Sequence, residues 1–185
     1  MATCVARESP YLCGMRLSAY IKDLVYGAND GIVTTFAVVA SVVGAGLEPN
    51  VILIVGFASL VADGFSMAAS DYLASKSERD ALRNNNHAGL HLASQENPLT
   101  AAAITFCAFL SAGSLPLLPY VFAPDARHLF LLTAAATGIA LILIGAGRTF
   151  ATGNAMVRSA LEMLLIGGAA VSVAFVTGRF VAALM

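Results

Sequence analysis

Five long runs of apolar residues alternate with polar segments along this chain of 185 residues. The runs cover residues 20–46, 51–73, 99–122, 128–147 and 159–184. A helix needs about 20 residues to cross the hydrocarbon core of a bilayer, which is roughly 30 Å thick. The pattern therefore predicts an all-α membrane protein with five transmembrane helices.

The segments between the runs define the domain boundaries that we expect. Residues 1–19 form a mixed tail without the apolar core or the cleavage site of a signal peptide, so we expect the tail to be retained. Residues 20–185 should form a single membrane domain with one long polar loop at residues 75–98. Within the third run, Pro116 and Pro119 should kink or fray the helix, because proline removes a backbone hydrogen bond.

The composition fits a membrane domain and excludes one class of partner. Hydrophobic residues make up 58% of the chain and charged residues 11%, whereas charged residues make up roughly a quarter of a soluble domain. The formal net charge of −1 gives no basic surface of the kind that binds nucleic acid, so we expect no nucleic-acid partner.

The basic residues predict the orientation in the membrane. Five spans put the two ends of the chain on opposite sides, and cytoplasmic loops carry an excess of Lys and Arg. Of the ten basic residues, all but Arg127 and Arg179 fall on one side of this topology. We therefore expect a cytoplasmic N-terminus, a cytoplasmic polar loop, and a C-terminus that lies outside the cell or in a lumen.

Two acidic residues and a methionine interrupt the second run. Asp63, Met67 and Asp71 are spaced four residues apart, which places them along one side of a helix over about 12 Å. An ionisable residue inside a membrane helix is costly and by default marks an ion or substrate path. Carboxylates are hard ligands and thioether sulfur favours transition metals, so the mixture indicates Fe²⁺ or Mn²⁺. Alternatively, Asp71 is solvated at the end of its helix and Met67 is a flexible core side chain.

A GxxxG pattern surrounds the acidic residue of the first run. Gly27 and Gly31 flank Asp30, and Thr34 follows one turn later. Small residues at this spacing let two membrane helices approach closely. If this face meets a second copy of the chain, two Asp30 carboxylates come together, and the face lines a dimer interface or a transport path. Packing within one subunit is the alternative.

Three further residues are weaker candidates for metal binding. His87 and His91 have the spacing to share a metal on one helical turn, although a solvated pair in the polar loop is the alternative. Glu162 follows Arg158 by four residues, so an ion pair competes with a role in the wall of a metal path.

Two segments resemble the first two membrane helices of the vacuolar iron transporter family, also called the cross-complements-calcium-sensitivity family: YGANDGIVTTFAVVASVVGAG and ADGFSMAASDYLASKSERD. The run LEMLLIGGAAVSVAFVTG is similar to the last helix of that family, which includes nodulin-21-like plant proteins. Together with the five spans, the resemblance covers most of the chain from Tyr20 onward.

The resemblance implies homodimers, with five membrane helices per subunit, that move Fe²⁺ and often Mn²⁺ out of the cytosol by proposed proton antiport. The path runs between the subunits and is lined by the first helices. Asp30 then matches the path aspartate and Met67 the path methionine. Asp63 and Asp71 lie where the family places acidic or polar residues. We expect metal ions and protons as partners, no permanently bound cofactor, and a bacterial inner membrane or a vacuolar or other endomembrane as the location.

One departure from the family pattern concerns the polar loop. Many members carry a helical cytosolic metal-binding domain with several Glu between the second and third membrane helices. Here only residues 75–98 are available, with Glu78 and Glu96 as their only glutamates. We infer that this domain is missing, which leaves the capture of cytosolic metal and the ion preference open.

Two other classes of function remain as alternatives to transport. Asp30 and Asp63 on neighbouring helices would also suit an intramembrane aspartyl protease, whose two carboxylates share a proton. That class carries YD and GxGD motifs, whereas the contexts here are AND-G and AD-G. A non-transporting membrane scaffold is the third interpretation. Transport without enzymatic activity is the function that the sequence favours.

Overall fold

The computed structural model describes residues 10–84, 97–122, 128–152 and 156–185. These residues form helices joined by short connections, and five helical stretches are long and apolar enough to cross a membrane. The all-α architecture with five transmembrane helices is therefore confirmed, and the protein is a multi-pass membrane protein. The elements are α1 (Pro10–Gly44), α2 (Pro49–Asn84), α4 (Pro98–Gly113), η1 (Leu115–Leu117), α5 (Leu118–Phe122), α6 (Leu129–Thr152) and α7 (Met156–Leu184).

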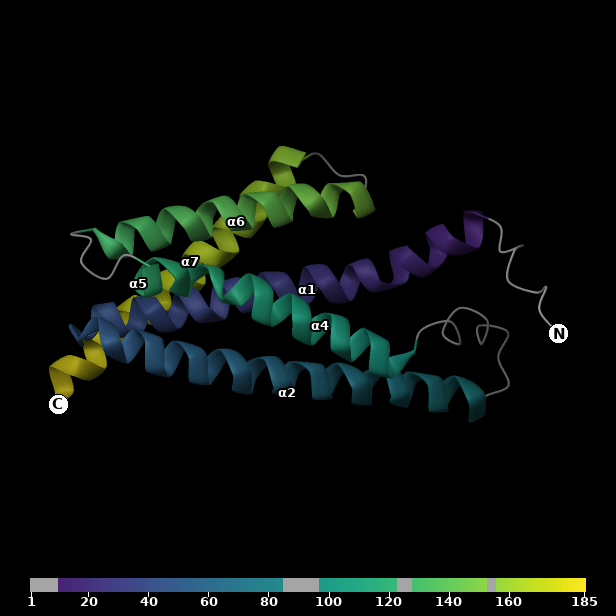
Figure 1. The fold of residues 1–185 in the computed structure, drawn as a ribbon, viewed down its shortest axis with the longest axis horizontal. Coiled ribbons are helices and arrows are strands. Elements are labelled where there is room, and N and C mark those ends of the chain that lie inside the picture. Colours follow the sequence, from purple (N-terminus) through teal and green to yellow (C-terminus); the bar gives the residue numbers. More distant parts are fainter. Residues whose placement is uncertain (1–9, 85–96, 123–127, 153–155) are drawn as a thin grey trace.

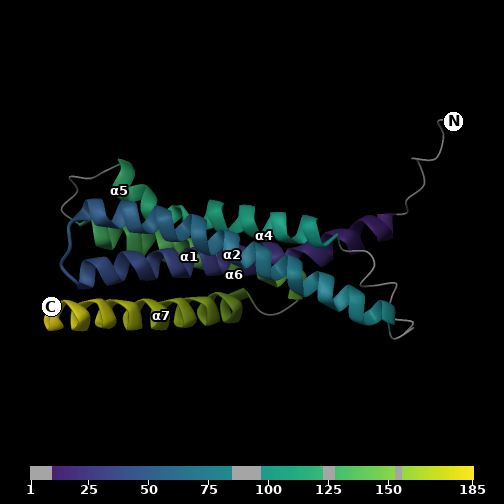
Figure 2. The same cartoon turned by 90° about the horizontal axis from the view of Figure 1, so that it is seen from below.

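Helix α1 lies at the centre of the bundle (Figure 1). It packs against α4, α7, α2 and α6, while α2 packs mainly against α4. Figure 2 shows α7 along one outer side of the bundle. Half of the residues in the most apolar stretch of α1 are buried inside the protein, against 11% in α7. Helix α1 therefore divides its surface among its neighbours, whereas most of the surface of α7 is not covered by the rest of the chain.

Two helices are longer than the apolar runs that predicted them. Helix α1 begins at Pro10 rather than near residue 20, and α2 continues to Asn84 rather than ending near residue 73. Proline is favoured at the first position of a helix, and the polar end of α2 is rich in Ala, Lys, Glu and Arg, which are good helix formers. Apolar runs mark the part of a helix that lipid covers, so they underestimate helices that continue into water.

The third span is interrupted where its prolines predicted a kink. Helix α4 ends at Gly113, a short 3₁₀ turn follows over Leu115–Leu117, and α5 completes the span. The Leu117 amide donates to the Ser114 carbonyl, as in a 3₁₀ turn. Pro116 is buried at this turn, where its missing N–H prevents a continuous α-helical ladder. The predicted break is therefore confirmed.

Glycines bring α1 and α4 into backbone contact. A Cβ atom added at Gly27 would lie 2.6 Å from the carbonyl oxygen of Thr105, and one added at Gly113 would lie 2.8 Å from the carbonyl oxygen of Gly31. Small residues are how membrane helices achieve such close approach. Of the two arrangements that the sequence left open for Gly27 and Gly31, the structure shows packing within one subunit.

Larger side chains fix the remaining faces of α1. The ring of Phe36 stacks on that of Phe130 from α6, with centroids 5.9 Å apart. Ile32 is fully buried in a cluster with Leu141 of α6 and Met163 of α7. These contacts set the rotation of α1 about its own axis, and that rotation decides where Asp30 points.

The close approach at Gly31 gives a first prediction. Replacing Gly31 with Ala should lower the free energy of unfolding by about 1–3 kcal/mol, because the added methyl group meets the Phe109 backbone and the helices must separate. Thermal unfolding of the purified protein in detergent measures the change. Gly138→Ala is the matched control, since nothing lies within 4 Å of a Cβ atom there. Equal melting temperatures for the two variants would contradict the prediction.

Candidate functional site

Two carboxylates from different membrane helices lie within electrostatic reach of each other. Asp30 is half-buried on α1, and Asp63 is exposed on α2. The two side chains are near enough to interact electrostatically. Both lie inside the membrane-spanning stretches of their helices, where an ionised group is costly unless a cation, a proton or water accompanies it. The pair is therefore the strongest candidate for a cation site in the described part of the chain.

The hydroxyl group of Thr34 supports this turn of α1. It donates to the carbonyl oxygen of Asp30 over 2.7 Å, so the polar group is satisfied within its own helix. Thr34 is half-buried, as is Val38 one turn further on. Asp30, Thr34 and Val38 thus lie on a stripe of α1 that its neighbours cover only in part.

The three polar residues of α2 do not face one point. Each step of four residues turns a side chain by about 40° around an α-helix, so Asp63, Met67 and Asp71 spread over about 80°. Asp63 faces outward, and half-buried Met67 packs against the apolar cluster that contains Leu60 and Phe109. Asp71 turns toward α4, where its carboxylate accepts a hydrogen bond of 2.8 Å from the Thr105 hydroxyl.

The structure therefore separates the sequence-predicted ligands into two groups. Asp30 and Asp63 lie within electrostatic reach of each other across α1 and α2, while Asp71 is engaged by α4. Among the residues that the structure describes, no three His, Cys, Asp or Glu side chains gather closely enough to hold a metal ion. Further donors to an ion at Asp30 and Asp63 would be sulfur, amide, hydroxyl or water ligands, or groups from a second copy.

Serines accompany Asp63 on the same outward side of α2. Ser66 and Ser70 are exposed and Ser59 is half-buried. At the same 100° turn per residue, the four side chains lie within about 60° of one another. They form a narrow polar stripe on a helix that is otherwise mostly apolar through its span.

Two polar groups near the site were not anticipated from the sequence. Thr105 is fully buried in a charge-free span, and only the structure shows that it binds Asp71. The Oδ1 atom of Asn29, the neighbour of Asp30, is buried and has no hydrogen-bond partner in the described parts of the chain. Burying a carbonyl oxygen without a hydrogen-bond partner is costly, so this atom is available to accept a hydrogen bond or to bind a cation. Its place beside Asp30 in the NDG element was the available signal.

The weaker candidates lie elsewhere. Glu162 is held by Arg158 of the same helix, with 3.2 Å between Oε1 and Nε, which is the ion pair that the sequence left open. His87 and His91 fall outside the described residues.

Comparisons with known proteins identify relatives of this chain. A sequence model of the VIT family matches residues 21–89 and 85–179. The chain is 27% identical to "Vacuolar iron transporter" of Centaurea cyanus, over 84% of this chain and 85% of the relative. It is 26% identical to "Vacuolar iron transporter 1" of Arabidopsis thaliana, over 87% and 86%. It is 29% identical to "Vacuolar iron transporter homolog 5" of Oryza sativa subsp. japonica, over 92% and 87%.

The alignment lengths and the boundary between the two family matches concern the polar loop. The Centaurea alignment has 208 positions although the chain has only 185 residues, so that relative contains residues that this chain lacks. The family match divides at residues 85–89, inside the polar loop. This is where a domain between the second and third membrane helices would be inserted. Two matches that together span residues 21–179, five apolar helices and named relatives that are matched over most of their length establish that the chain belongs to the VIT family.

Proposed function

We propose that this protein exports Fe²⁺ or Mn²⁺ from the cytosol along a path beside α1 and α2, in a vacuolar or other endomembrane or a bacterial inner membrane. The observation that carries the proposal is that Asp30 and Asp63 lie within electrostatic reach of each other inside the membrane spans. The names of the relatives, vacuolar iron transporters, support a metal ion as the substrate.

The chemistry of the pair suits a divalent cation. Two carboxylates supply two negative charges and hard oxygen ligands, which balance the charge of one M²⁺ ion in a medium where an uncompensated charge is costly. Met67 lies one turn from Asp63 and adds a soft sulfur atom at the edge of the site. A thioether discriminates in favour of transition metals over Ca²⁺ and Mg²⁺.

Proton antiport follows from the same carboxylates. An acidic ligand must lose its proton to bind metal, so metal binding and proton release are linked. Metal arriving from the cytosol would displace protons from Asp30 and Asp63. An acidic compartment on the far side would protonate the pair and release the metal there, which gives transport a direction. Asp71, one turn beyond Met67, would bind metal transiently nearer the polar end of α2.

A homodimer would complete the site. The stripe of α1 that contains Asp30, Thr34 and Val38 is only half-covered in one chain, and the family resemblance places the first helices at a subunit interface. A second copy would add a second Asp30 and convert the incomplete donor set of one chain into a shared one. Because Gly27 and Gly31 are occupied by α4, the contact would use the neighbouring face of α1.

Replacing Met67 with Leu should weaken Fe²⁺ transport while leaving the fold intact. Leu has nearly the same volume, so packing against the apolar cluster is retained, but the sulfur ligand is lost. The measurement is the initial rate of Fe²⁺ uptake into proteoliposomes. Met163→Leu is the matched control, because Met163 is buried among α1, α6 and α7 away from Asp63. Unchanged uptake by the Met67 variant would show that this side chain serves packing alone.

The dimer should have α1 at its centre. A cysteine at Thr34 or Val38, in a chain whose own cysteines are replaced by Ser, should form a cross-link with its counterpart under mild oxidation. A cysteine at the exposed Leu143 of α6 provides the comparison. Efficient cross-linking from Leu143 and none from Thr34 or Val38 would overturn this arrangement.

Replacing Asp30 with Asn should abolish metal transport and its dependence on a pH gradient. Asn keeps the shape and one carbonyl oxygen, but it can neither neutralise a cation nor exchange a proton. Metal flux into proteoliposomes with an imposed pH gradient measures both effects, and size-exclusion chromatography checks that the assembly is retained. Asp80→Asn, on the exposed polar end of α2, should transport at the unmodified rate. Gradient-dependent flux through the Asp30 variant would transfer the coupling role to Asp63.

A further inference from the structure

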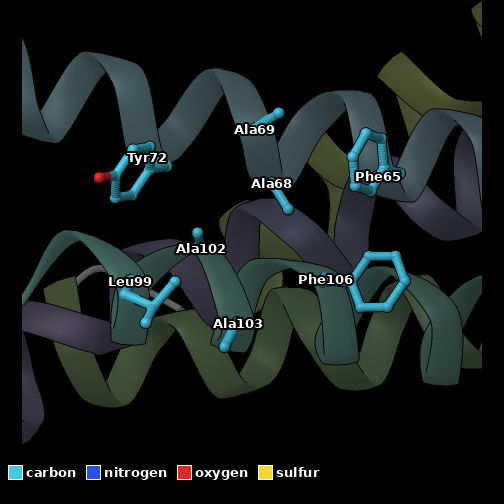
Figure 3. A pocket seen from close by; sticks show the side chains of 8 residues that line it. All are labelled: Phe65, Ala68, Ala69, Tyr72, Leu99, Ala102, Ala103 and Phe106. Carbon is cyan, nitrogen blue, oxygen red and sulfur yellow. The ribbon is translucent and has the colours of Figure 1, made fainter.

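An apolar groove runs along the outer surface between α2 and α4 (Figure 3). Four alanines form its floor, namely Ala68 and Ala69 of α2 and Ala102 and Ala103 of α4. Larger side chains stand at its two ends, with Phe65 and Phe106 at one and Tyr72 and Leu99 at the other. The small residues that face each other across the two helices leave the groove open, and the larger residues limit the length of the groove.

The groove is separate from the proposed metal path. Around α2, Phe65 and Tyr72 lie roughly 160–180° from Asp63 at 100° per residue. Asp63 and the aromatic residues of the groove therefore lie on opposite flanks of the same helix. A ligand in the groove would not touch the Asp30 and Asp63 pair.

The dimensions of the groove select its occupant. Its volume is about 330 Å³. Phe65 and Tyr72 are seven residues apart, which is about 10 Å along a helix, so the mean cross-section is roughly 30 Å². A helix with side chains is about 10–12 Å wide and has a cross-section of roughly 80 Å² or more. The groove is therefore wide enough for one hydrocarbon chain, whereas a whole helix would lie across it without entering it.

One end of the groove reaches the depth of the lipid headgroups. About 20 residues of helix cross the hydrocarbon core, so a span that begins near Val51 leaves it near Asp71. Tyr72 follows at the interface, where Tyr is enriched in membrane proteins, and its hydroxyl points away from the groove floor in Figure 3. The apolar floor thus lies in the outer part of the hydrocarbon layer, and the Tyr72 hydroxyl lies at the end of the groove that is nearest to the headgroups.

Positive charge lies directly beyond that end. Lys76 is exposed and follows Tyr72 by one turn and Phe65 by three turns, so it continues the face that lines the groove. On the other side, Leu99 belongs to the first turn of α4, whose N-terminus carries a partial positive charge. Asp80, one turn beyond Lys76, is further from the groove. Lys76 is therefore the basic side chain one turn beyond this end of the groove, in reach of an anionic group there.

From this geometry we infer that the groove binds one acyl chain of an anionic phospholipid whose phosphate is held by Lys76 and the Tyr72 hydroxyl. The apolar floor would hold the acyl chain, and Lys76, which is in line with the floor, would give the preference for an anionic headgroup. A second groove between α1 and α4, lined by residues such as Ala108 and Ser111, has a comparable volume of about 480 Å³ and serves as an internal comparison. The basic residue nearest to it on α1, Lys22, faces away from Leu24 in its lining.

The test compares lipids that share the same acyl chains. Phosphatidylglycerol and phosphatidylcholine are added to the delipidated full-length protein in detergent, and retained lipid is counted by native mass spectrometry while the melting temperature is recorded. Phosphatidylglycerol should bind more tightly and raise the melting temperature more. Lys76→Gln should reduce the affinity for phosphatidylglycerol about fivefold and leave phosphatidylcholine unchanged, as expected for one basic residue at an anionic lipid. Arg179→Gln, an exposed basic residue of α7, should change neither.

A second pair of variants tests the groove itself. Ala103→Leu fills the floor and should abolish retention of the tightly bound phosphatidylglycerol, whereas Cys107→Leu at the exposed rim of the comparison groove should not. Equal affinity for the two lipids, or an unchanged preference in the Lys76 variant, would overturn the inference. Full stabilisation by glycerol phosphate alone would do the same, since the chain would then be irrelevant. Conversion of a dimer to a monomer by Ala103→Leu would assign the groove to a second subunit instead.

Discussion

The backbone contact between α1 and α4 is the constraint on which the rest of the structure depends. Apolar helices gain little from burial in lipid, so their association relies on close packing. Gly27 and Gly31 of α1 and Gly113 of α4 allow that approach. Once α4 occupies this face, the bulky side chains of α1, such as Ile32 and Phe36, must turn toward α6 and α7. The central position of α1 therefore follows from glycines, which have no side chain and so let α4 approach closely.

The same contact orients the candidate site. With one face of α1 against α4 and another against α6 and α7, Asp30 lies on the remaining, partly covered face beside α2. Helix α2 is held by its own contacts with α4, including the hydrogen bond between Asp71 and Thr105. Helix α4 is thus the common support of both helices that carry the carboxylates. A cation between Asp30 and Asp63 would be positioned by a helix that contributes no charge in its described residues.

Much of this arrangement could be predicted from the sequence, but not all. The apolar runs indicated the five spans, and Pro116 indicated the break in the third. The cost of placing a charge inside a membrane singled out Asp30 and Asp63, and the sequence placed them on neighbouring helices. Their proximity depends on the packing of two helices, however, and a pattern along one helix carries no information about it. For the same reason the hydrogen bond from Thr105 to Asp71 was not foreseen. The even spacing of Asp63, Met67 and Asp71 suggested that the three side chains point in one direction, but each step of four residues turns the side chain by about 40°.

The length of α2 has a mechanical consequence. Its 36 residues extend for about 54 Å, whereas the hydrocarbon core is roughly 30 Å thick. One continuous rod therefore joins the turn that bears Asp63 to a charged segment far outside the lipid. A sideways force on the protruding end near Asp80 would therefore be transmitted along one helix to the turn that bears Asp63.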